Sequence, residues 1–231
     1  MITLNKIYAP LVSNDTRYNI VTGGRGSGKS FAITTLLCLM MLEKDRTILF
    51  LRQTLTSAHI SIIPEFIEKL EILGIENQFR ITKTEIEHTT TGSKILFRGI
   101  TTGSKNNTAN LKSLNGVSVM VVDEAEELTD EDTFDRIDLS VRKQGVVNKV
   151  ILVMNPSRVD HWIYKRFFKD AGINGGWSGS TNDCTYIHTT YLDNINNLDE
   201  SFIEQLERLK SNNLKKYNHL VLGEWSDGDS D

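Results

Sequence analysis

The sequence predicts an α/β fold in which helices cover both faces of a mostly parallel central sheet, with an antiparallel strand insertion. Short apolar runs alternate with longer helical segments, which is the pattern of a parallel sheet with crossover helices. Several runs, such as "ILFL" and "VILVM", contain no polar residue, as expected of strands buried on both faces. The 231 residues are 39% hydrophobic and 24% charged, so the chain is large enough to bury a substantial core.

The expected elements follow from local patterns. Residues 79–99 alternate around a Thr-Gly-Ser turn, which predicts antiparallel strands. Gly74 is expected to close an amphipathic helix. The expected buried strands cover 18–24, 46–53, 118–128, 148–156 and 184–192, and the expected helices cover 30–44, 61–74 and, as one or two helices, 199–225.

Charge and composition narrow the functional classes. The net charge of −4 argues against a static DNA-binding protein, which needs many phosphate contacts, but allows a transient or local basic contact. No apolar run approaches the roughly 18 residues of a membrane span, and the N-terminus lacks the pattern of a signal peptide. Cys38 and Cys184 are far apart in sequence and are expected to be reduced and structural. A cytoplasmic setting is therefore expected.

The stretch "GGRGSGKS" carries the pattern G-x-x-x-x-G-K-S between an expected strand and an expected helix. This context predicts a phosphate-binding loop that holds a nucleoside triphosphate, because backbone N–H groups and the helix N-terminus face the phosphates. Lys29 is expected to reach the β- and γ-phosphates, and Ser30 to ligate Mg²⁺. The residues predicted to bind the nucleotide are Gly23, Gly24, Arg25, Gly26, Ser27, Gly28, Lys29 and Ser30.

Two acids follow the apolar run "VMVV" and complete the predicted site. Asp123 is expected to hold Mg²⁺ through water, and Glu124 to polarise the attacking water as general base. We interpret Glu126 and Glu127 as solvated surface acids. The adjacent Asp-Glu pair indicates a motor-type ATPase, because a signalling GTPase positions its water with a glutamine.

A polar residue at the tip of a neighbouring strand can sense the γ-phosphate, and Asn155 in "VILVMNP" is the candidate. The transferring phosphoryl group also needs a cation. Arg25, inside the loop, is the strongest candidate, and Arg142 and Lys112 are the others, acting on their own or a neighbouring nucleotide. Tyr8, Pro10 and Arg17 are candidates to flank the adenine base, or else pack structurally.

Five stretches occur in an order that resembles the N-terminal ATPase domain of the phage terminase large subunit. They are "GGRGSGKS", "VVDEAEEL", "ILVMNPSRVDHWIY", "IHTTYLDNINNLDESFIEQLERLK" and "YNHLVLGEW". The resemblance covers nearly the whole chain. Its most particular part is "HTTYLDN" followed by a helix and "LGEW", because the phosphate-binding loop alone is common to many ATPases.

The resemblance implies a P-loop NTPase of the additional-strand catalytic-glutamate class that uses ATP and Mg²⁺. Such a motor drives double-stranded viral DNA into a procapsid, with the portal protein and the terminase small subunit as partners. It implies that Asp123 binds Mg²⁺, Glu124 is catalytic, Asn155 belongs to the coupling motif and Arg25 senses the γ-phosphate. A trans-acting arginine finger is expected at Arg142 or near Lys112, within a homo-oligomeric ring, a pentamer.

The same resemblance sets expectations for domains and location. Residues 1–225 are expected to form the ATPase domain, and 226–231 a polar tail or the start of a linker to a nuclease domain. Nuclease activity is not expected from this segment, which is either a piece of a longer chain or the partner of a separate nuclease chain. The protein is expected in the host cytoplasm, transiently at the procapsid portal, and not in the mature virion.

Two other functions stay open on sequence alone. One is a helicase-like ATPase that remodels nucleic acid, and the other is a non-catalytic nucleotide-binding regulator, which Glu124 argues against. The DNA-contacting residues are the least determined part. The candidates are Lys83, Lys94, Arg98, Lys105 and Lys112, while the basic stretch 207–216 is expected to be a solvated helix face or a ring contact.

Overall fold

A computed structural model describes residues 4–54, 58–100 and 116–228. Its centre is a sheet with strand order β3-β4-β5-β2-β6-β7-β1-β9-β8. The strands from β5 to β9 in this order pair in parallel, whereas β3, β4 and β5 pair antiparallel to one another and β8 pairs antiparallel to β9. The strands are β1 (Tyr18–Gly23), β2 (Thr47–Arg52), β3 (Phe79–Ile81), β4 (Glu85–His88), β5 (Lys94–Gly99), β6 (Val119–Asp123), β7 (Lys149–Met154), β8 (Gly179–Ser180) and β9 (Cys184–Thr189).

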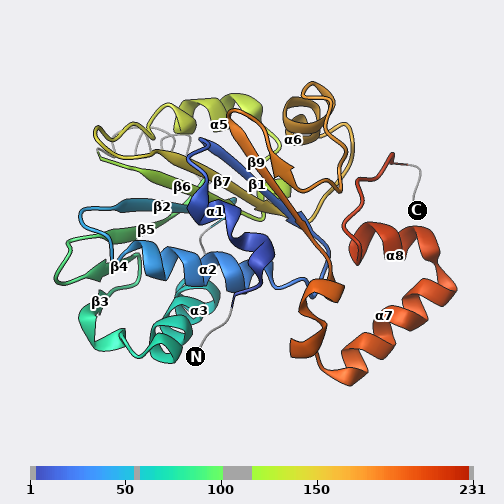
Figure 1. The fold of residues 1–231 in the computed structure, drawn as a ribbon, viewed down its shortest axis with the longest axis horizontal. Helices are drawn as coiled ribbons and strands as arrows, with labels where there is room; N and C mark the ends of the chain where they lie inside the picture. Colours follow the sequence, from blue (N-terminus) through green and yellow to red (C-terminus); the bar gives the residue numbers. More distant parts are fainter. Residues whose placement is uncertain (1–3, 55–57, 101–115, 229–231) are drawn as a thin grey trace.

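Helices cover both faces of this sheet (Figure 1). Helices α2 (Lys29–Met40) and α3 (Ala58–Leu73) lie on one face, and α5 (Glu131–Asp138) and α6 (Trp162–Tyr164) lie on the other. Helices α7 (Glu200–Asn212) and α8 (Leu214–Leu220) form a pair beside the sheet. The remaining short helices are α1 (Pro10–Ser13), the 3-10 turns η1 (Lys6–Tyr8), η2 (Glu76–Gln78), η3 (Ala125–Glu127) and η5 (Tyr191–Asn197), and the π-helical turn η4 (Lys165–Lys169).

The central strands are buried because both faces are covered. All five residues of β6 and all six of β7 are buried. Under α3, the rings of Phe50, Phe66 and Phe97 pack edge to face or tilted, with centroids 5.3 to 5.7 Å apart. Aromatic pairs in this geometry contribute about 0.5–1.5 kcal/mol beyond the area they bury. A separate apolar cluster fills the opposite face, under α5 and α6.

The C-terminal helices have a small core of their own. Tyr191, Leu206, Tyr217 and Val221 are buried there, and the Tyr191 and Tyr217 hydroxyls lie 3.0 Å apart. In the basic stretch 207–216, Arg208 and Lys210 each pair with a glutamate about one turn earlier. These pairings agree with the expected solvated helix face.

The predicted α/β architecture is confirmed, and so is the antiparallel insertion. The helix expected at 61–74 ends at Leu73, and Gly74 follows it with φ of 69°. The strand expected over 118–128 stops at Asp123, because Glu124 adopts a left-handed backbone that turns the chain out of the sheet. Cys38 and Cys184 are buried free thiols, as expected. Within the described residues, no helix has the length and apolar character that crossing a bilayer requires.

Replacing Phe66 by alanine should lower the free energy of unfolding by about 3–5 kcal/mol, because it leaves a cavity between α3 and the sheet. Phe66 is fully buried, whereas Leu139 is 71% exposed. Urea denaturation of Phe66→Ala and of the control Leu139→Ala measures both effects, and the control should change by less than about 1 kcal/mol. Equal losses in the two variants would contradict this account of the core.

Candidate functional site

The candidate site lies at the carboxyl ends of the neighbouring strands β2, β6, β7 and β1. Parallel strands bring their carboxyl ends to one edge of the sheet, which is where α/β proteins bind ligands. The phosphate-binding loop follows β1, Asp123 ends β6, Asn155 follows β7 and Arg52 ends β2. A small cavity of about 100 Å³ joins these elements and is lined by Lys29, Ser30, Arg52, Asp123, Glu124, Glu126, Val153, Met154 and Asn155.

The loop between β1 and α2 needs glycine for two different reasons. Gly28 caps α2 with φ of 80°, a left-handed conformation that a side chain disfavours. Gly24 packs against the chain after α8, and a Cβ there would lie 1.8 Å from the Val221 carbonyl oxygen. The loop therefore presents bare backbone at the N-terminus of α2, a 12-residue helix whose dipole favours an anion at this end.

Lys29 is folded back onto the loop. Its ammonium donates to the carbonyl oxygens of Gly23 at 2.7 Å and Gly24 at 3.1 Å, and to Asn155 Oδ1 at 3.0 Å. Ser27 Oγ is 3.2 Å away. Burial lowers the pKa of Lys29 to about 8, although Glu126 and Asp123 favour the charged form. The ammonium is thus largely desolvated and held by acceptors that a phosphate could replace.

Asp123 and Glu124 have different surroundings although they are adjacent. Asp123 Oδ2 accepts from Arg52 Nε at 2.8 Å and from Arg52 Nη2 at 2.6 Å. Glu124 projects into solvent, with a side chain 46% exposed and Oε2 3.8 Å from Arg52 Nε. Burial raises the pKa of Glu124, Arg52 opposes this, and Asp123 adds to it. A raised pKa makes a carboxylate a stronger general base.

Glu124 also has a strained backbone, with φ of 54° and ψ of 46°. A left-handed conformation costs a non-glycine residue on the order of 1 kcal/mol or more, and such outliers cluster at functional sites. The turn lifts the Glu124 side chain out of the sheet while Asp123 keeps its place in β6. The left-handed turn at Glu124 therefore places the two adjacent carboxylates differently: Asp123 stays at the sheet edge, and Glu124 faces the open cavity.

Glu126 belongs to the site, and its interpretation as a solvated surface acid is wrong. Its Oε2 is buried without a hydrogen-bond partner among the described residues, and its Oε1 accepts from Asn155 Nδ2 at 3.4 Å. Burial raises the pKa of Glu126. The 3-10 turn η3 brings this side chain to the small cavity that Lys29 also lines, whereas Glu127 is exposed as expected. Asn155 thus connects Lys29 to Glu126.

The residues present fit a magnesium ion bound together with phosphate. The Ser30 hydroxyl and the Asp123 carboxylate are hard oxygen donors of the kind that Mg²⁺ prefers. Within the described ranges, no cluster of three or more histidine, cysteine, aspartate or glutamate residues could hold a metal ion. Phosphate oxygens and water would therefore supply most of the coordination, as is usual for Mg²⁺ at nucleotide sites.

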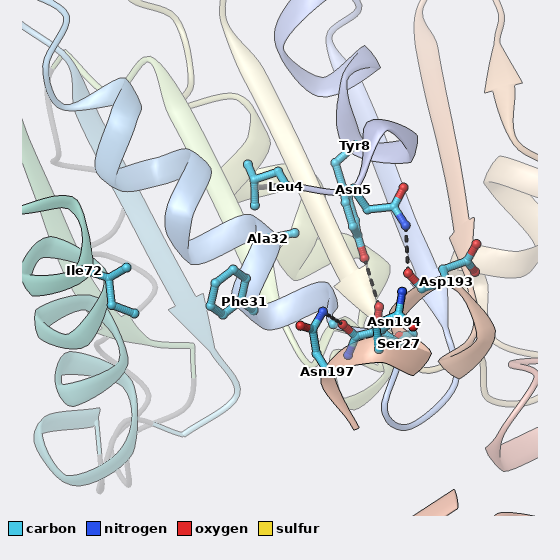
Figure 2. A pocket seen from close by; sticks show the side chains of 12 residues that line it. Leu4, Asn5, Tyr8, Ser27, Phe31, Ala32, Ile72, Asp193, Asn194 and Asn197 are labelled. Carbon is cyan, nitrogen blue, oxygen red and sulfur yellow. Dashed lines mark hydrogen bonds between the residues drawn. The ribbon is translucent and has the colours of Figure 1, made fainter. Parts of the chain in front are cut away.

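A second and larger cavity, of about 850 Å³, lies beside the same loop (Figure 2). Ser27 and Gly28 form part of its wall, with Phe31 of α2 and side chains from η1 and η5 around it. Tyr8 lines it and is buried, its hydroxyl 3.3 Å from Thr189 Oγ1. The other lining residues are Leu4, Asn5, Ala32, Ile72, Asp193, Asn194, Asn196 and Asn197.

The other two candidates for the adenine pocket lie elsewhere. Pro10 opens α1 and does not line this cavity. Arg17 fits the alternative of structural packing, because its guanidinium donates to Asp138 Oδ1 at 2.6 Å and pairs with it. Arg17 precedes β1, so the length of the strand, roughly 20 Å, separates it from the loop.

The remaining candidate cations occupy different places. Arg25 is exposed at the tip of the loop. Arg142 is exposed and lies at the opposite edge of the sheet, where the parallel strands begin. Its position follows from its neighbour Val141, whose carbonyl oxygen accepts a hydrogen bond of 3.3 Å from Arg17, the residue before β1. Of the predicted DNA contacts, Lys83 is exposed near the turn between β3 and β4, and Lys94 and Arg98 are half-buried on β5. Lys105 and Lys112 lie outside the described residues.

Arg52 is the main residue that sequence reasoning missed. It ends the apolar run "TILFLR" at the same edge as Asp123 and Asn155. Asn155 is a candidate because it is a polar residue at the end of an apolar strand, and the same criterion would also select Arg52. The apolar run could not show that β2 lies next to β6 in the sheet. Within the described residues, the chain forms three other strands between β2 and β6, and one of these, β5, pairs with the other side of β2.

Comparisons with known proteins agree with this geometry. The sequence profile of a family described as phage terminase large subunit matches residues 15–224. The PBSX phage terminase large subunit of Bacillus subtilis (strain 168) is 28% identical over 204 residues, which cover 84% of this chain and 46% of that protein.

Two solved structures show the same fold at low sequence identity. The large terminase of bacteriophage HK97 aligns with a TM-score of 0.69 and 11% identity, over 97% of this chain and 50% of that one. The ATPase domain of the large terminase from Thermus phage P74-26 aligns with a TM-score of 0.66 and 13% identity, over 97% and 94%. The chain spans about half the length of the curated relatives it matches.

Replacing Lys29 by methionine should change how stability depends on pH. The pKa of Lys29 is about 8 in the fold, below its ordinary value of 10.5, so above about pH 8 the unfolded chain binds the proton more tightly. Stability of the wild type should therefore rise relative to Lys29→Met between about pH 8 and 10, by at most about 1.4 kcal/mol per pH unit. Urea denaturation at several pH values measures this difference, and parallel curves for the two proteins would contradict it.

Proposed function

Because the chain belongs to the phage terminase large subunit family, we propose that it is an ATP-hydrolysing motor domain that drives double-stranded viral DNA into a procapsid. The observation that carries the proposal is the convergence of the phosphate-binding loop, Asp123, Glu124 and Asn155 at one sheet edge. A nucleotide-binding regulator would not need Glu124, whose carboxylate faces the open cavity beside the loop.

The two cavities divide the nucleotide between them. The triphosphate lies over the loop, between the Lys29 side and the N-terminus of α2. The base and ribose occupy the larger cavity, where Tyr8 and Phe31 offer aromatic surface. Tyr8 is the member of the predicted adenine set that this arrangement supports.

Each side chain has a separate part in hydrolysis. Lys29 exchanges the carbonyls of Gly23 and Gly24 for phosphate oxygens, with its charge retained below about pH 8. Ser30 and Asp123 would hold Mg²⁺, and the ion would supply positive charge that neutralises the phosphates. Glu124 takes a proton from the attacking water, and Arg25 approaches the γ-phosphate from the tip of the loop.

Asn155 links phosphate to the rest of the domain. It contacts both Lys29 and Glu126, so a change in what Lys29 binds changes the partners of Asn155. On the other side, Arg25 N donates to the Leu220 carbonyl at 2.9 Å, and Asn194 Nδ2 donates to the Gly26 carbonyl at 2.9 Å. These contacts join the loop to η5 and α8 and give the nucleotide site a route to the C-terminal helices.

Arg142 can serve only a neighbouring subunit. It lies at the amino edge of the sheet, about one strand length from the loop of its own chain. In the proposed homo-oligomeric ring, for which we expect five subunits, that edge would face the next nucleotide site. The portal protein, the terminase small subunit and double-stranded DNA complete the proposed assembly, in the host cell at the procapsid portal.

Replacing Glu124 by glutamine should lower the ATPase rate by about 10²- to 10⁴-fold, because the amide cannot accept the proton of the attacking water. Binding of a fluorescent ATP analogue should be retained. Glu127→Gln is the matched control, since it removes the same charge from an exposed neighbour and should keep the wild-type rate. Steady-state phosphate release measures both variants, and an active Glu124→Gln would contradict the assignment.

Mixing two inactive variants tests Arg142 in trans. In a ring, a Glu124→Gln subunit supplies an intact Arg142 to its neighbour, and an Arg142→Ala subunit supplies an intact Glu124. Equimolar mixtures should therefore hydrolyse ATP at a measurable fraction of the wild-type rate when each variant alone is at least about tenfold slower. Phosphate release should also rise per subunit with protein concentration. Mixtures that stay as slow as the separate variants would exclude Arg142 as the finger.

A further inference from the structure

Arg52 binds the carboxylate that is assigned to magnesium. Both Nε and Nη2 of its guanidinium donate to the same oxygen, Asp123 Oδ2, at 2.8 and 2.6 Å. The pair is largely shielded from water, since the side chains of Arg52 and Asp123 are 19% and 11% exposed. Charge-assisted contacts of this length are about twice as strong as neutral hydrogen bonds. Asp123 Oδ2 is therefore already bound to a cation of the protein itself, the Arg52 guanidinium.

Arg52 also faces two further carboxylates. Glu124 Oε2 lies 3.8 Å from Nε, and Glu65 of α3 is close enough that Arg52 opposes the rise that burial causes in the pKa of Glu65. Asp123, Glu124 and Glu65 would repel one another in a partly buried site without a cation among them. Lys29 is not available for this task, because its ammonium is held by Gly23, Gly24 and Asn155.

We infer that Arg52 is a built-in counter-ion that takes the place of the divalent cation at Asp123 until a metal–nucleotide complex arrives. The inference rests on the proposed assignment of Asp123 as a magnesium ligand. A guanidinium on Asp123 Oδ2 and a divalent cation held by the same carboxylate, directly or through water, repel each other, so binding of one weakens binding of the other. Glu124 and Glu65 are the carboxylates that can receive Arg52 when it leaves.

This exchange makes metal binding depend on nucleotide. A free divalent cation would have to break both contacts to Arg52 and would gain only the Ser30 hydroxyl and one carboxylate in return. With nucleotide present, phosphate oxygens add ligands and their charge also attracts the displaced guanidinium. Arg52 is thus a positioning residue, which holds Asp123 in place and keeps an isolated metal ion out.

The test measures Mn²⁺ alone, added to the nucleotide-free protein and followed through the free-ion signal in electron paramagnetic resonance. Wild type should bind Mn²⁺ weakly. Arg52→Gln should bind it on the order of tenfold or more tightly, because a contact between charged groups no longer has to be broken. Arg52→Met, which keeps an apolar stem of similar length, should show the same gain and serves if the glutamine variant does not fold.

Two controls separate this effect from a general change in charge. Arg80→Gln removes the same charge from the β3–β4 hairpin, where Arg80 pairs with Glu87 and is 68% exposed, and should leave Mn²⁺ binding unchanged. Adding Asp123→Asn to Arg52→Gln should abolish the gain. Equal Mn²⁺ affinity in wild type and the Arg52 variants would overturn the inference, as would a gain that survives loss of Asp123. Mn²⁺ binding is measured without nucleotide, so loss of ATPase activity in a variant would not by itself change the measured affinity.

Discussion

The side-by-side parallel alignment of β2, β6, β7 and β1 is the constraint on which the rest of this structure depends. It places the ends of four strands at one edge, so that residues far apart in sequence become neighbours: Arg52, Asp123, Asn155 and the phosphate-binding loop. Burial of the central strands on both faces fixes the register at this edge, because a slip of one residue would move every side chain of a strand to the opposite face and disrupt the packing of both apolar clusters. The packing of buried apolar side chains in the central strands thus positions the functional groups at the strand ends.

The charges at this edge satisfy one another in the absence of a ligand. Lys29 is held by carbonyl oxygens and Asn155, and Arg52 is held by Asp123. Desolvated charges raise the free energy of the fold unless they are paired, so the charged groups of a partly buried site need partners within the protein when no ligand is bound. On the proposed function, a nucleotide and its metal ion would bind by exchanging these partners for new ones, and Lys29 and Arg52 have further contacts, to Asn155 and Glu124, that the exchange would alter.

The C-terminal helices contact the backbone of the phosphate-binding loop. Val221 and Gly223 pack directly against Gly23 and Gly24, and there is no room for a Cβ at Gly24. The α7–α8 pair has its own small core, so it can respond as a unit to a movement of the loop. This arrangement places the distinctive tail "LGEW" against the backbone of the phosphate-binding loop, through Gly223.

The sequence by itself determined the architecture and most of the site, because apolar runs and the phosphate-binding pattern depend on spacing along the chain. Lys29, Ser30, Asp123, Glu124 and Asn155 all follow from motifs at strand ends, and the structure brings them to one cavity. Only the tertiary structure decided which other charges join them. Arg52 joins the site because β2 is the neighbour of β6, and Glu126 joins it because η3 turns its side chain inward. Arg17 is excluded because it precedes β1 and lies at the opposite end of that strand from the loop. Strand order and side-chain direction arise from packing between distant segments, which local patterns do not record.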